Sequence, residues 1–151
     1  MDGGSLQGSG PLIQLVVDRV VEDPATDTRI VVLARKDGDL EHFMVWVGAS
    51  EGEAIKRALD TSLTARPMSH DLIKSCGEHL GITTERVVLT DVKSSTYYAT
   101  VFLENKGVPR TLDARPSDAI SLALRCQAPI YVTQDVWQRR SGQQLDAWLS
   151  K

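Results

Sequence analysis

The chain is poor in cysteine and has no long apolar run, and each shortage excludes a class of protein. Its 151 residues include two cysteines, Cys76 and Cys126, without the CxxC or histidine-rich spacing of a zinc site. We therefore expect two small, buried, unpaired thiols in a reducing compartment. No run approaches the roughly 20 apolar residues of a membrane span. Residues 1–10 lack the basic and apolar segments of a signal peptide, so we expect a cytoplasmic protein without a membrane segment.

The familiar catalytic signatures are also missing. The sequence contains no GxSxG, no HExxH, no P-loop and no GxGxxG before a helix. Aromatic residues make up 5% of the chain, and no predicted strand combines basic and aromatic residues as an RNA-stacking platform does. The formal net charge of −3 at pH 7 argues against an extensive nucleic-acid surface. A local basic groove, or a phosphate site bridged by a cation, is compatible with that charge.

Strand and helix patterns alternate along one domain of ordinary length. We predict an α+β fold with a mixed β-sheet, because hairpin signals accompany at least one long crossover. Residues 1–10 are expected to form a flexible arm, 11–135 the domain, and 136–151 a tail with a short amphipathic helix through Leu145, Trp148 and Leu149. Strands are predicted at 12–22, 29–35, 40–47, 86–92, 96–103, up to 112 and at 129–133, and helices at about 51–60, 69–80 and 116–126.

The predicted helix at 116–126 is apolar almost all round. Pro116 suits the first position of a helix, where its missing N–H is not needed. The polar residues of this segment fall on one narrow stripe, made by Asp118, Ser121 and Arg125 at spacings of three and four. A helix with so little polar surface is buried. We therefore expect it at the centre of the domain, with its stripe facing polar partners.

Ser69, His70 and Asp71 form the first polar cluster, at the predicted start of a helix. His70 is a candidate general base, and Asp71 is a candidate catalytic or metal-binding carboxylate. The alternative is helix capping, in which the Ser69 hydroxyl accepts a backbone N–H and Asp71 favours the positive end of the helix dipole. The residue types favour capping and leave the catalytic role open.

Two further polar clusters follow. Asp91 ends a predicted strand before the Lys93–Ser95 turn, where a carboxylate binds a ligand or its own backbone. The third cluster places Asp113, Arg115 and Asp118 at the mouth of the buried helix. Two carboxylates there can hold a divalent cation, and a guanidinium can bind phosphate through two hydrogen bonds. The alternative is an ion pair between Arg115 and one of the aspartates.

The order and spacing of several segments resemble the bifunctional nuclease family, which occurs in bacteria and plants. This resemblance covers about residues 12–135 and implies an α+β domain that tends to form homo-oligomers and cleaves DNA and RNA. The chain departs from the family pattern at Ser69, often Thr, at Lys93–Ser95, often an acidic turn, and at Asp60, where a small residue is expected. The matching segments are Val45-Trp46-Val47-Gly48 with Glu53-Ala54-Ile55, Arg66-Pro67-Met68-Ser69-His70-Asp71-Leu72, Val87–Asp91 with Thr96-Tyr97-Tyr98-Ala99, and Asp113-Ala114-Arg115-Pro116-Ser117-Asp118-Ala119-Ile120 with Ala123-Leu124-Arg125 and Pro129-Ile130.

The resemblance points to residues that match the family motifs. The candidate catalytic residues are His70, Asp71, Asp113 and Arg115. The candidate substrate-binding residues are Arg115 and Arg125, together with Lys93, a basic residue that could bind phosphate at the turn where the chain departs from the family pattern. The candidate ligands of Mg²⁺ or Mn²⁺ are Asp91, Asp113 and Asp118.

Two hypotheses about function follow. The first is a metal-assisted nuclease that acts on DNA and RNA with little sequence preference. The second is a non-catalytic, oligomeric binding or regulatory module, in which the cluster from Asp113 to Asp118 is structural. The negative net charge and the missing catalytic signatures favour the second hypothesis, whereas the family resemblance favours the first.

Overall fold

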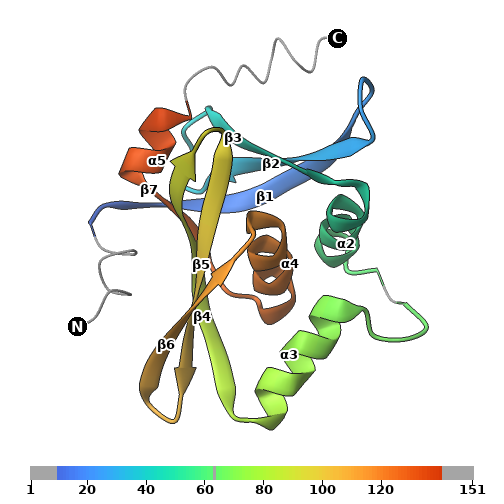
Figure 1. The fold of residues 1–151 in the computed structure, drawn as a ribbon, viewed down its shortest axis with the longest axis vertical. Helices are drawn as coiled ribbons and strands as arrows, with labels where there is room; N and C mark the ends of the chain where they lie inside the picture. The colour runs from blue at the N-terminus through green and yellow to red at the C-terminus, as the bar shows by residue number, and fades with distance from the viewer. Residues whose placement is uncertain (1–9, 63, 141–151) are drawn as a thin grey trace.

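The computed structural model describes residues 10–62 and 64–140, which form one seven-stranded sheet and four helices (Figure 1). None of the helices in this part of the chain is long and apolar enough to cross a membrane. The elements are β1 (Leu12–Asp23), β2 (Thr28–Arg35), β3 (His42–Gly48), α2 (Ala49–Leu59), α3 (Ser69–His79), β4 (Ile82–Lys93), β5 (Thr96–Asn105), β6 (Val108–Ala114), α4 (Pro116–Cys126), β7 (Ile130–Thr133) and α5 (Gln134–Arg139).

The sheet has the strand order β3-β2-β1-β7-β4-β5-β6. β4 and β7 pair in parallel, and the other neighbouring strands of the described sheet are antiparallel. The predicted mixed sheet and α+β class are therefore confirmed. Strand twist accumulates along the sheet, so β1, β2 and β3 run steeply across β4, β5 and β6 (Figure 1). β3 and β6 are the two edges of the sheet.

Helix α4 lies at the centre of the core, as its apolar sequence predicts. Ala119, Ile120 and Ala123 have no exposed surface. They pack in one cluster with apolar residues of the sheet, α2 and α5, for example Phe43 of β3 and Ile55 of α2. The helix starts at Pro116, the predicted position, and ends at Gln127 with a left-handed φ of 55°. The sequence pattern was sufficient to predict the position and burial of this helix, because a helix that is apolar on nearly every side is buried.

Helix α3 departs from the predictions made for it. No residue of α3 is buried, and Leu72, Ile73 and Leu80 are more than half exposed. Cys76 is exposed and Cys126 is half-buried, so the prediction of two buried thiols was wrong. An amphipathic pattern predicts an apolar face but not the element that covers it. Gly81 follows the end of α3 with a left-handed φ of 75°, which suits a glycine after a helix.

The ends of the chain are only partly described. The predicted arm at 1–10 lies outside the described residues except for Gly10, and so does the amphipathic segment with Leu145, Trp148 and Leu149. Helix α5 crosses the boundary placed between residues 135 and 136. Its Val136 and Trp137 are buried in the main core.

Two helical glycines differ in the space around them. A Cβ on Gly52 of α2 would lie 2.5 Å from Arg29 Cβ and Cγ, whereas one on Gly77 of α3 would lie 3.6 Å from the Ile82 carbonyl oxygen. We expect Gly52→Ala to lower the free energy of unfolding, because overpacking costs about 1–3 kcal/mol and the roughly 1 kcal/mol helix propensity gain offsets only part of it. Gly77→Ala should be neutral or stabilising, and denaturant unfolding of both variants tests this difference. Equal stability of the two variants would contradict the close packing of α2 on β2.

Candidate functional site

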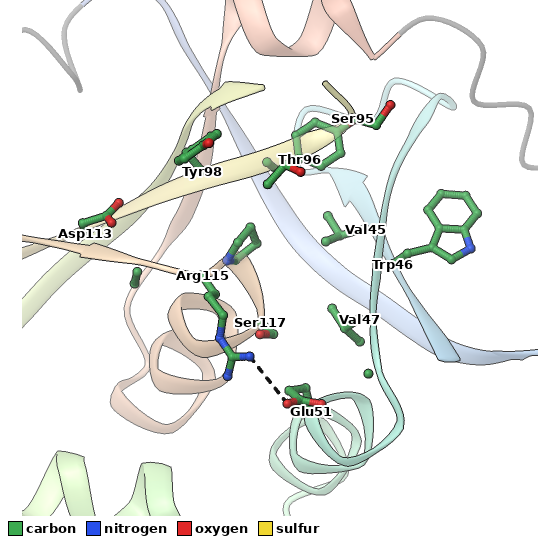
Figure 2. A pocket seen from close by; sticks show the side chains of 14 residues that line it. Val45, Trp46, Val47, Glu51, Ser95, Thr96, Tyr98, Asp113, Arg115 and Ser117 are labelled. Carbon is green, nitrogen blue, oxygen red and sulfur yellow. Dashed lines mark ion pairs between the residues drawn. The ribbon is translucent and has the colours of Figure 1, made fainter. Parts of the chain in front are cut away.

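A cleft of about 570 Å³ lies between the two edges of the sheet (Figure 2). Its walls come from segments far apart in the sequence, because the curvature of the sheet brings β3 close to β5 and β6. The lining residues are Val45–Gly48 of β3, Glu51 of α2, Ser95–Tyr98 around the start of β5, and Asp113–Ser117 from the end of β6 into α4.

The N-termini of α2 and α4 both contribute to this cleft. Neither N-cap residue, Gly48 or Arg115, accepts a capping hydrogen bond through its side chain. The first-turn N–H groups and the positive dipole ends of two helices therefore meet at one place, an arrangement that favours anions. The Glu51 carboxylate occupies the space beside the Gly48 Cα, and a side chain at position 48 would overlap it. Ser50 and Glu53 have the spacing of a capping box in the sequence, but Ser50 does not cap α2, because the helix begins at Ala49.

Arg115 extends into the cleft from the start of α4, and its side chain is 65% exposed. Its Nε and Nη2 donate to the two carboxylate oxygens of Asp118 at 2.9 and 3.3 Å. Its Nη1 lies 3.6 Å from Glu51 Oε2, as Figure 2 shows. Asp118 thus fixes one edge of the guanidinium, and the other edge faces Glu51 and the cleft. This geometry suits a guanidinium that binds phosphate.

Asp113 lines the same cleft but lies apart from Arg115, beside Tyr98 (Figure 2). It pairs in register with Thr100 of β5, and it is exposed. We find no ion pair between Asp113 and a cationic side chain in the described part of the chain. Of the three predicted metal ligands, Asp113 is the one that lines the cleft.

His70 and Asp118 connect α3 to α4 behind Arg115. His70 Nε2 lies 3.0 Å from Asp118 Oδ1, and the His70 side chain is only 13% exposed. Burial disfavours the Asp118 carboxylate, but hydrogen bonds from Arg115 and His70 outweigh burial and hold its pKa below the usual value. His70 does not line the cleft. Its contact with Asp118 supports a positioning role.

Asp71 and Arg125 make a second connection between the same helices. Asp71 Oδ2 accepts the Met68 N–H at 2.8 Å, so Asp71 caps α3, and the predicted cap by Ser69 was wrong. Arg125 Nε donates to Asp71 Oδ1 at 2.8 Å. The Met68 N–H and the Arg125 guanidinium outweigh burial and lower the pKa of Asp71.

The Arg125 guanidinium also joins α2 to α4. It donates to the Ser121 hydroxyl at 2.6 Å and to the Ala54 carbonyl oxygen at 3.3 Å. With its side chain only 7% exposed, Arg125 is fully engaged inside the protein. The predicted polar stripe of α4 thus faces polar partners, and the geometry favours a structural role for Arg125 over a substrate contact.

Asp91 and Lys93 lie at the end of β4, away from Asp118. Asp91 Oδ1 accepts from Arg139 Nη2 of α5 at 2.8 Å, and Lys93 Nζ lies 3.7 Å from Asp91 Oδ2. The Arg139 hydrogen bond and the Val92 N–H lower the pKa of Asp91. Among the described residues, no group of three or more His, Cys, Asp or Glu side chains has the arrangement of a metal site. The structure therefore does not bring Asp91, Asp113 and Asp118 together as one set of ligands.

Sequence reasoning missed three residues of the cleft. Glu51 faces Arg115, Trp46 lies on the β3 side with its indole pointing away from the cleft, and Tyr98 lies on the β5 side (Figure 2). No single strand carries both aromatic residues, so a search for a basic and aromatic pattern within one strand could not find them. An exposed tryptophan next to inward-facing valines in β3 was the available signal.

The fold and the cleft define a small α+β domain with a cleft that the N-termini of two helices line. The chain belongs to the bifunctional nuclease domain family, because a sequence model of that domain matches residues 31–144. An uncharacterized protein of Mycobacterium tuberculosis is 33% identical over 121 residues, covering 80% of this chain and 71% of that protein.

Two plant proteins are more distant. Bifunctional nuclease 1 of Oryza sativa subsp. japonica is 28% identical over 109 residues, and Bifunctional nuclease 1 of Arabidopsis thaliana is 29% identical over 107 residues. The matches cover 70% and 69% of this chain but 33% of each plant protein. The matched part thus spans about a third of the length of these plant relatives.

The position of Asp118 predicts a pH-dependent contribution to stability. We expect Asp118→Asn to lower the free energy of unfolding by about 1–2 kcal/mol at pH 7, because it removes a charged acceptor from His70 and Arg115. Because the folded-state pKa of Asp118 is lowered, its contribution is complete above the ordinary value of 3.8 and is lost as pH falls below it. The stability gap between wild type and variant should therefore shrink below about pH 4.

Asp113→Asn is the matched control, since it removes an exposed carboxylate at the same cleft. Its stability should stay within about 0.5 kcal/mol of wild type. Denaturant unfolding at several pH values measures both variants. A gap for Asp118→Asn that persists unchanged into acid would contradict the assignment of a lowered pKa to its carboxylate.

Proposed function

We propose that this chain is a nuclease that hydrolyses phosphodiester bonds of DNA and RNA with little sequence preference, and that the reaction takes place in the cleft between β3 and β6. The observation that carries this proposal is that the N-termini of α2 and α4, neither with a capping hydrogen bond from its N-cap side chain, line one cleft with the exposed Arg115 guanidinium. The plant relatives are named bifunctional nucleases, which supports the reaction class. Backbone N–H groups and a guanidinium recognise phosphate, not bases, so low sequence preference follows from the same features.

Arg115 binds the phosphate and Asp118 positions Arg115 in this proposal. Asp118 keeps its hydrogen bonds to Nε and Nη2, while the substrate phosphate replaces Glu51 near Nη1. Bound phosphate then receives the guanidinium on one side and first-turn N–H groups on the other, and these donors stabilise the charge that develops on its oxygens. His70 supports Asp118 from behind and does not contact the substrate.

A requirement for Mg²⁺ or Mn²⁺ is part of the proposal. Asp113, whose carboxylate lines the cleft, is the residue that would hold the cation, since Mg²⁺ is commonly bound through one or two carboxylates and substrate phosphates. Such a cation polarises the phosphate and lowers the pKa of bound water. Asp91 does not take part, because Arg139 and Lys93 occupy its carboxylate.

Cleavage of labelled single- and double-stranded DNA and RNA tests the proposal, with Mg²⁺, Mn²⁺ or EDTA present. We expect EDTA to abolish cleavage and Asp113→Asn to reduce it at unchanged fold stability. Arg115→Gln should lower kcat/KM by about 10- to 100-fold, since a hydrogen bond to a charged group contributes about 1.5–3 kcal/mol. Lys36→Gln is the control, because it removes the same charge from an exposed turn that does not line the cleft. Equal trace cleavage by all four proteins would indicate a contaminating nuclease and favour the non-catalytic binding module.

We also propose that the chain forms a homo-oligomer through the exposed apolar side of α3. A groove of about 400 Å³ lies between α3, β4, β6 and α4, and it includes Ile73, Leu80 and Leu112. Leu80 and Leu112 are more than half exposed. Next to this groove, all but the last residue of the edge strand β6 are exposed. An apolar groove beside an open sheet edge is typical of a surface that pairs with another chain.

Sedimentation or light scattering over a range of concentrations tests the oligomer. Wild type should be oligomeric, and Leu80→Asp combined with Leu112→Asp should shift it to the monomer, because two charges would enter an apolar interface. Leu40→Asp is the control, since Leu40 is almost fully exposed in the loop before β3. A wild-type chain that is monomeric throughout would contradict this proposal and leave the nuclease proposal intact.

A further inference from the structure

The β4–β5 hairpin forms one wall of the cleft, and its turn has an unusual backbone. Lys93 pairs with Thr96, so Ser94 and Ser95 are the two central residues of the turn. Both have left-handed φ angles, 50° and 66°. Turns with two left-handed residues usually contain asparagine, aspartate or glycine, because other residues rarely adopt this conformation. Two serines therefore favour this turn only weakly, although Ser95 and Thr96 line the cleft.

Arg139 of α5 holds the strand that leads into this turn. Its Nη1 donates to the Val92 carbonyl oxygen at 3.0 Å, and its Nη2 donates to Asp91 Oδ1 at 2.8 Å. Asp91 Oδ1 also accepts the Val92 N–H at 2.8 Å. The register of β4 on β5 shifts between Leu89 and Asp91, so the guanidinium binds β4 beside an interruption of its regular ladder. Arg139 itself does not line the cleft.

Helix α5 fixes the position of Arg139. Asp135 Oδ2 accepts from Arg139 Nε at 3.0 Å within the same helix. The Thr133 hydroxyl caps α5 by accepting the Val136 N–H at 3.1 Å. Val136 has no exposed surface, and the neighbouring Trp137 is buried in the main core. The guanidinium thus extends from a helix that is held firmly against the sheet.

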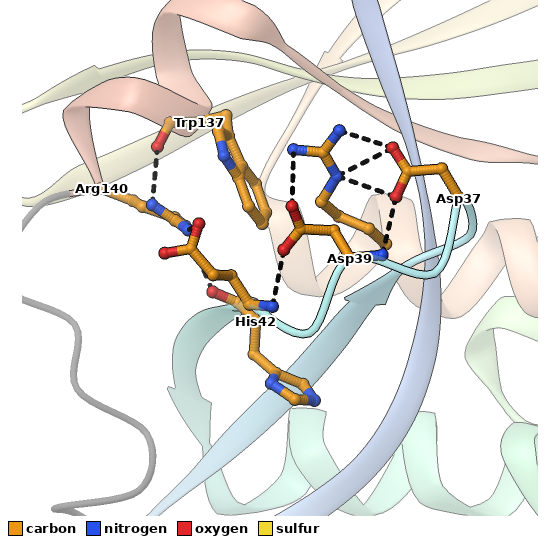
Figure 3. Close-up of polar contacts among 7 residues, drawn as sticks. Asp37, Asp39, His42, Trp137 and Arg140 are labelled. Carbon is orange, nitrogen blue, oxygen red and sulfur yellow. Dashed lines mark hydrogen bonds and ion pairs between the residues drawn. The ribbon is translucent and has the colours of Figure 1, made fainter.

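A second set of contacts holds α5 on β3. Arg140 Nε donates to the His42 carbonyl oxygen at 3.2 Å (Figure 3). Arg140 Nη2 lies 3.3 Å from Glu41 Oε2, and its guanidinium lies 3.6 Å from the centre of the Trp137 ring. Trp137 in turn stacks on Phe43 of β3, with 6.2 Å between the ring centres. Helix α5 is therefore fixed to β3, the strand that forms the facing wall of the cleft.

These contacts make α5 a connection between two walls that are not neighbours in the sheet. Strands β2, β1 and β7 lie between β3 and β4 in the strand order. Tyr97, which lines the cleft, adds a direct contact, because its ring centre lies 5.0 Å from that of Phe43. The separation of the two walls thus depends on the packing of α5 on β3 and on the hold of Arg139 on the hairpin.

We propose that Arg139 is a positioning residue, which holds the β4–β5 turn in the conformation that forms the wall of the cleft beside the substrate. This inference rests on the proposed nuclease function and adds to it a residue outside the cleft. Because the two serines favour the left-handed turn only weakly, the contacts from Arg139 supply what the local sequence does not. Their loss leaves Arg115 and Asp113 in place and lets the wall move, so substrate binding weakens and the chemical step does not.

Hydrogen exchange of the free protein tests the hold on the turn without any substrate. Arg139→Gln should speed the exchange of the backbone amides at residues 93–98 and leave the β5–β6 turn at residues 105–108 unchanged. Arg19→Gln is the matched control, because it removes the same charge from an exposed ion pair with Asp18 that does not line the cleft. Thermal melting verifies that each variant is folded. Equal exchange at residues 93–98 in Arg139→Gln and wild type would overturn the inference.

Cleavage kinetics test the positioning role, with labelled single-stranded DNA and RNA as substrates and Mg²⁺ present. Arg139→Gln should raise KM by about 3- to 10-fold at unchanged kcat, a size typical of the cost of ordering a side chain at a binding surface. A rise in KM alone indicates lost binding, whereas partial unfolding would lower kcat and leave KM unchanged. Arg19→Gln should match wild type in both constants. A lower kcat at constant KM in Arg139→Gln would contradict the positioning role.

A turn sequence that favours the left-handed conformation should compensate for the missing guanidinium. Ser94→Asn and Ser95→Gly, added to Arg139→Gln, give Asn-Gly, which is strongly preferred in such turns. We expect slow exchange at residues 93–98 and most of the lost affinity to return in this combined variant. If its exchange and KM stay at the values of Arg139→Gln, then Arg139 does not act through the turn and the inference is wrong.

The two readouts separate this inference from the nuclease proposal. A wild-type chain that cleaves no substrate would overturn the nuclease proposal, and with it the role of Arg139 towards substrate, while the exchange rates still test its hold on the turn. Cleavage by wild type, with KM and exchange unchanged in Arg139→Gln, would overturn this inference alone. Faster exchange and a higher KM in Arg139→Gln, both reversed by the Asn-Gly turn, are the results we expect.

Discussion

The polar stripe of α4 is the constraint on which the rest of the structure depends. A guanidinium and a carboxylate on an otherwise apolar, central helix must find partners, because an unpaired buried charge is very costly. Arg125 donates hydrogen bonds to Asp71, Ser121 and the Ala54 carbonyl oxygen. Asp118 is hydrogen-bonded to His70 and Arg115. These contacts fix α2 and α3 on α4. Since α2 and α4 are fixed in this way, their N-termini reach the same cleft. The site is thus a consequence of how one buried helix satisfies its few polar groups.

Arg115 stands between this internal network and the cleft. Its Nε and Nη2 donate hydrogen bonds to the Asp118 carboxylate, and its Nη1 lies at the longer distance of 3.6 Å from Glu51 Oε2. A phosphate that enters the cleft competes with Glu51 more easily than with Asp118, because the Glu51 contact is the longer one. The orientation of the guanidinium is therefore retained when its outer partner changes. Such preorganisation lowers the entropy lost on binding, and in the proposed reaction His70 and Asp118 would position Arg115 without contacting the substrate.

The sequence predicted those parts of the molecule whose patterns are local. The buried helix at 116–126 and its stripe were predictable because 3.6-residue periodicity and three polar residues specify them without reference to distant segments. The cleft was not predictable in this way. Trp46, Glu51 and Tyr98 come from three elements and border one cleft only because the sheet curves. Asp91 was grouped with Asp113 by family motif, yet Arg139 of α5 occupies it. Cys76 was expected inside because an amphipathic face does not reveal what covers it.

The low charge of the chain constrains how the proposed nuclease would bind nucleic acid. Each neutralised phosphate contributes to affinity by releasing counterions, with a salt slope of about −0.9 per phosphate on duplex DNA. A chain with a net charge of −3, and a cleft with one guanidinium facing two carboxylates, neutralises few phosphates. Its affinity must therefore come from contacts that do not scale with charge. In the proposed reaction, helix N-termini would supply directed N–H groups for one phosphate. Such contacts depend on the direction of a few donors and not on the net charge of the chain, so an acidic chain can make them.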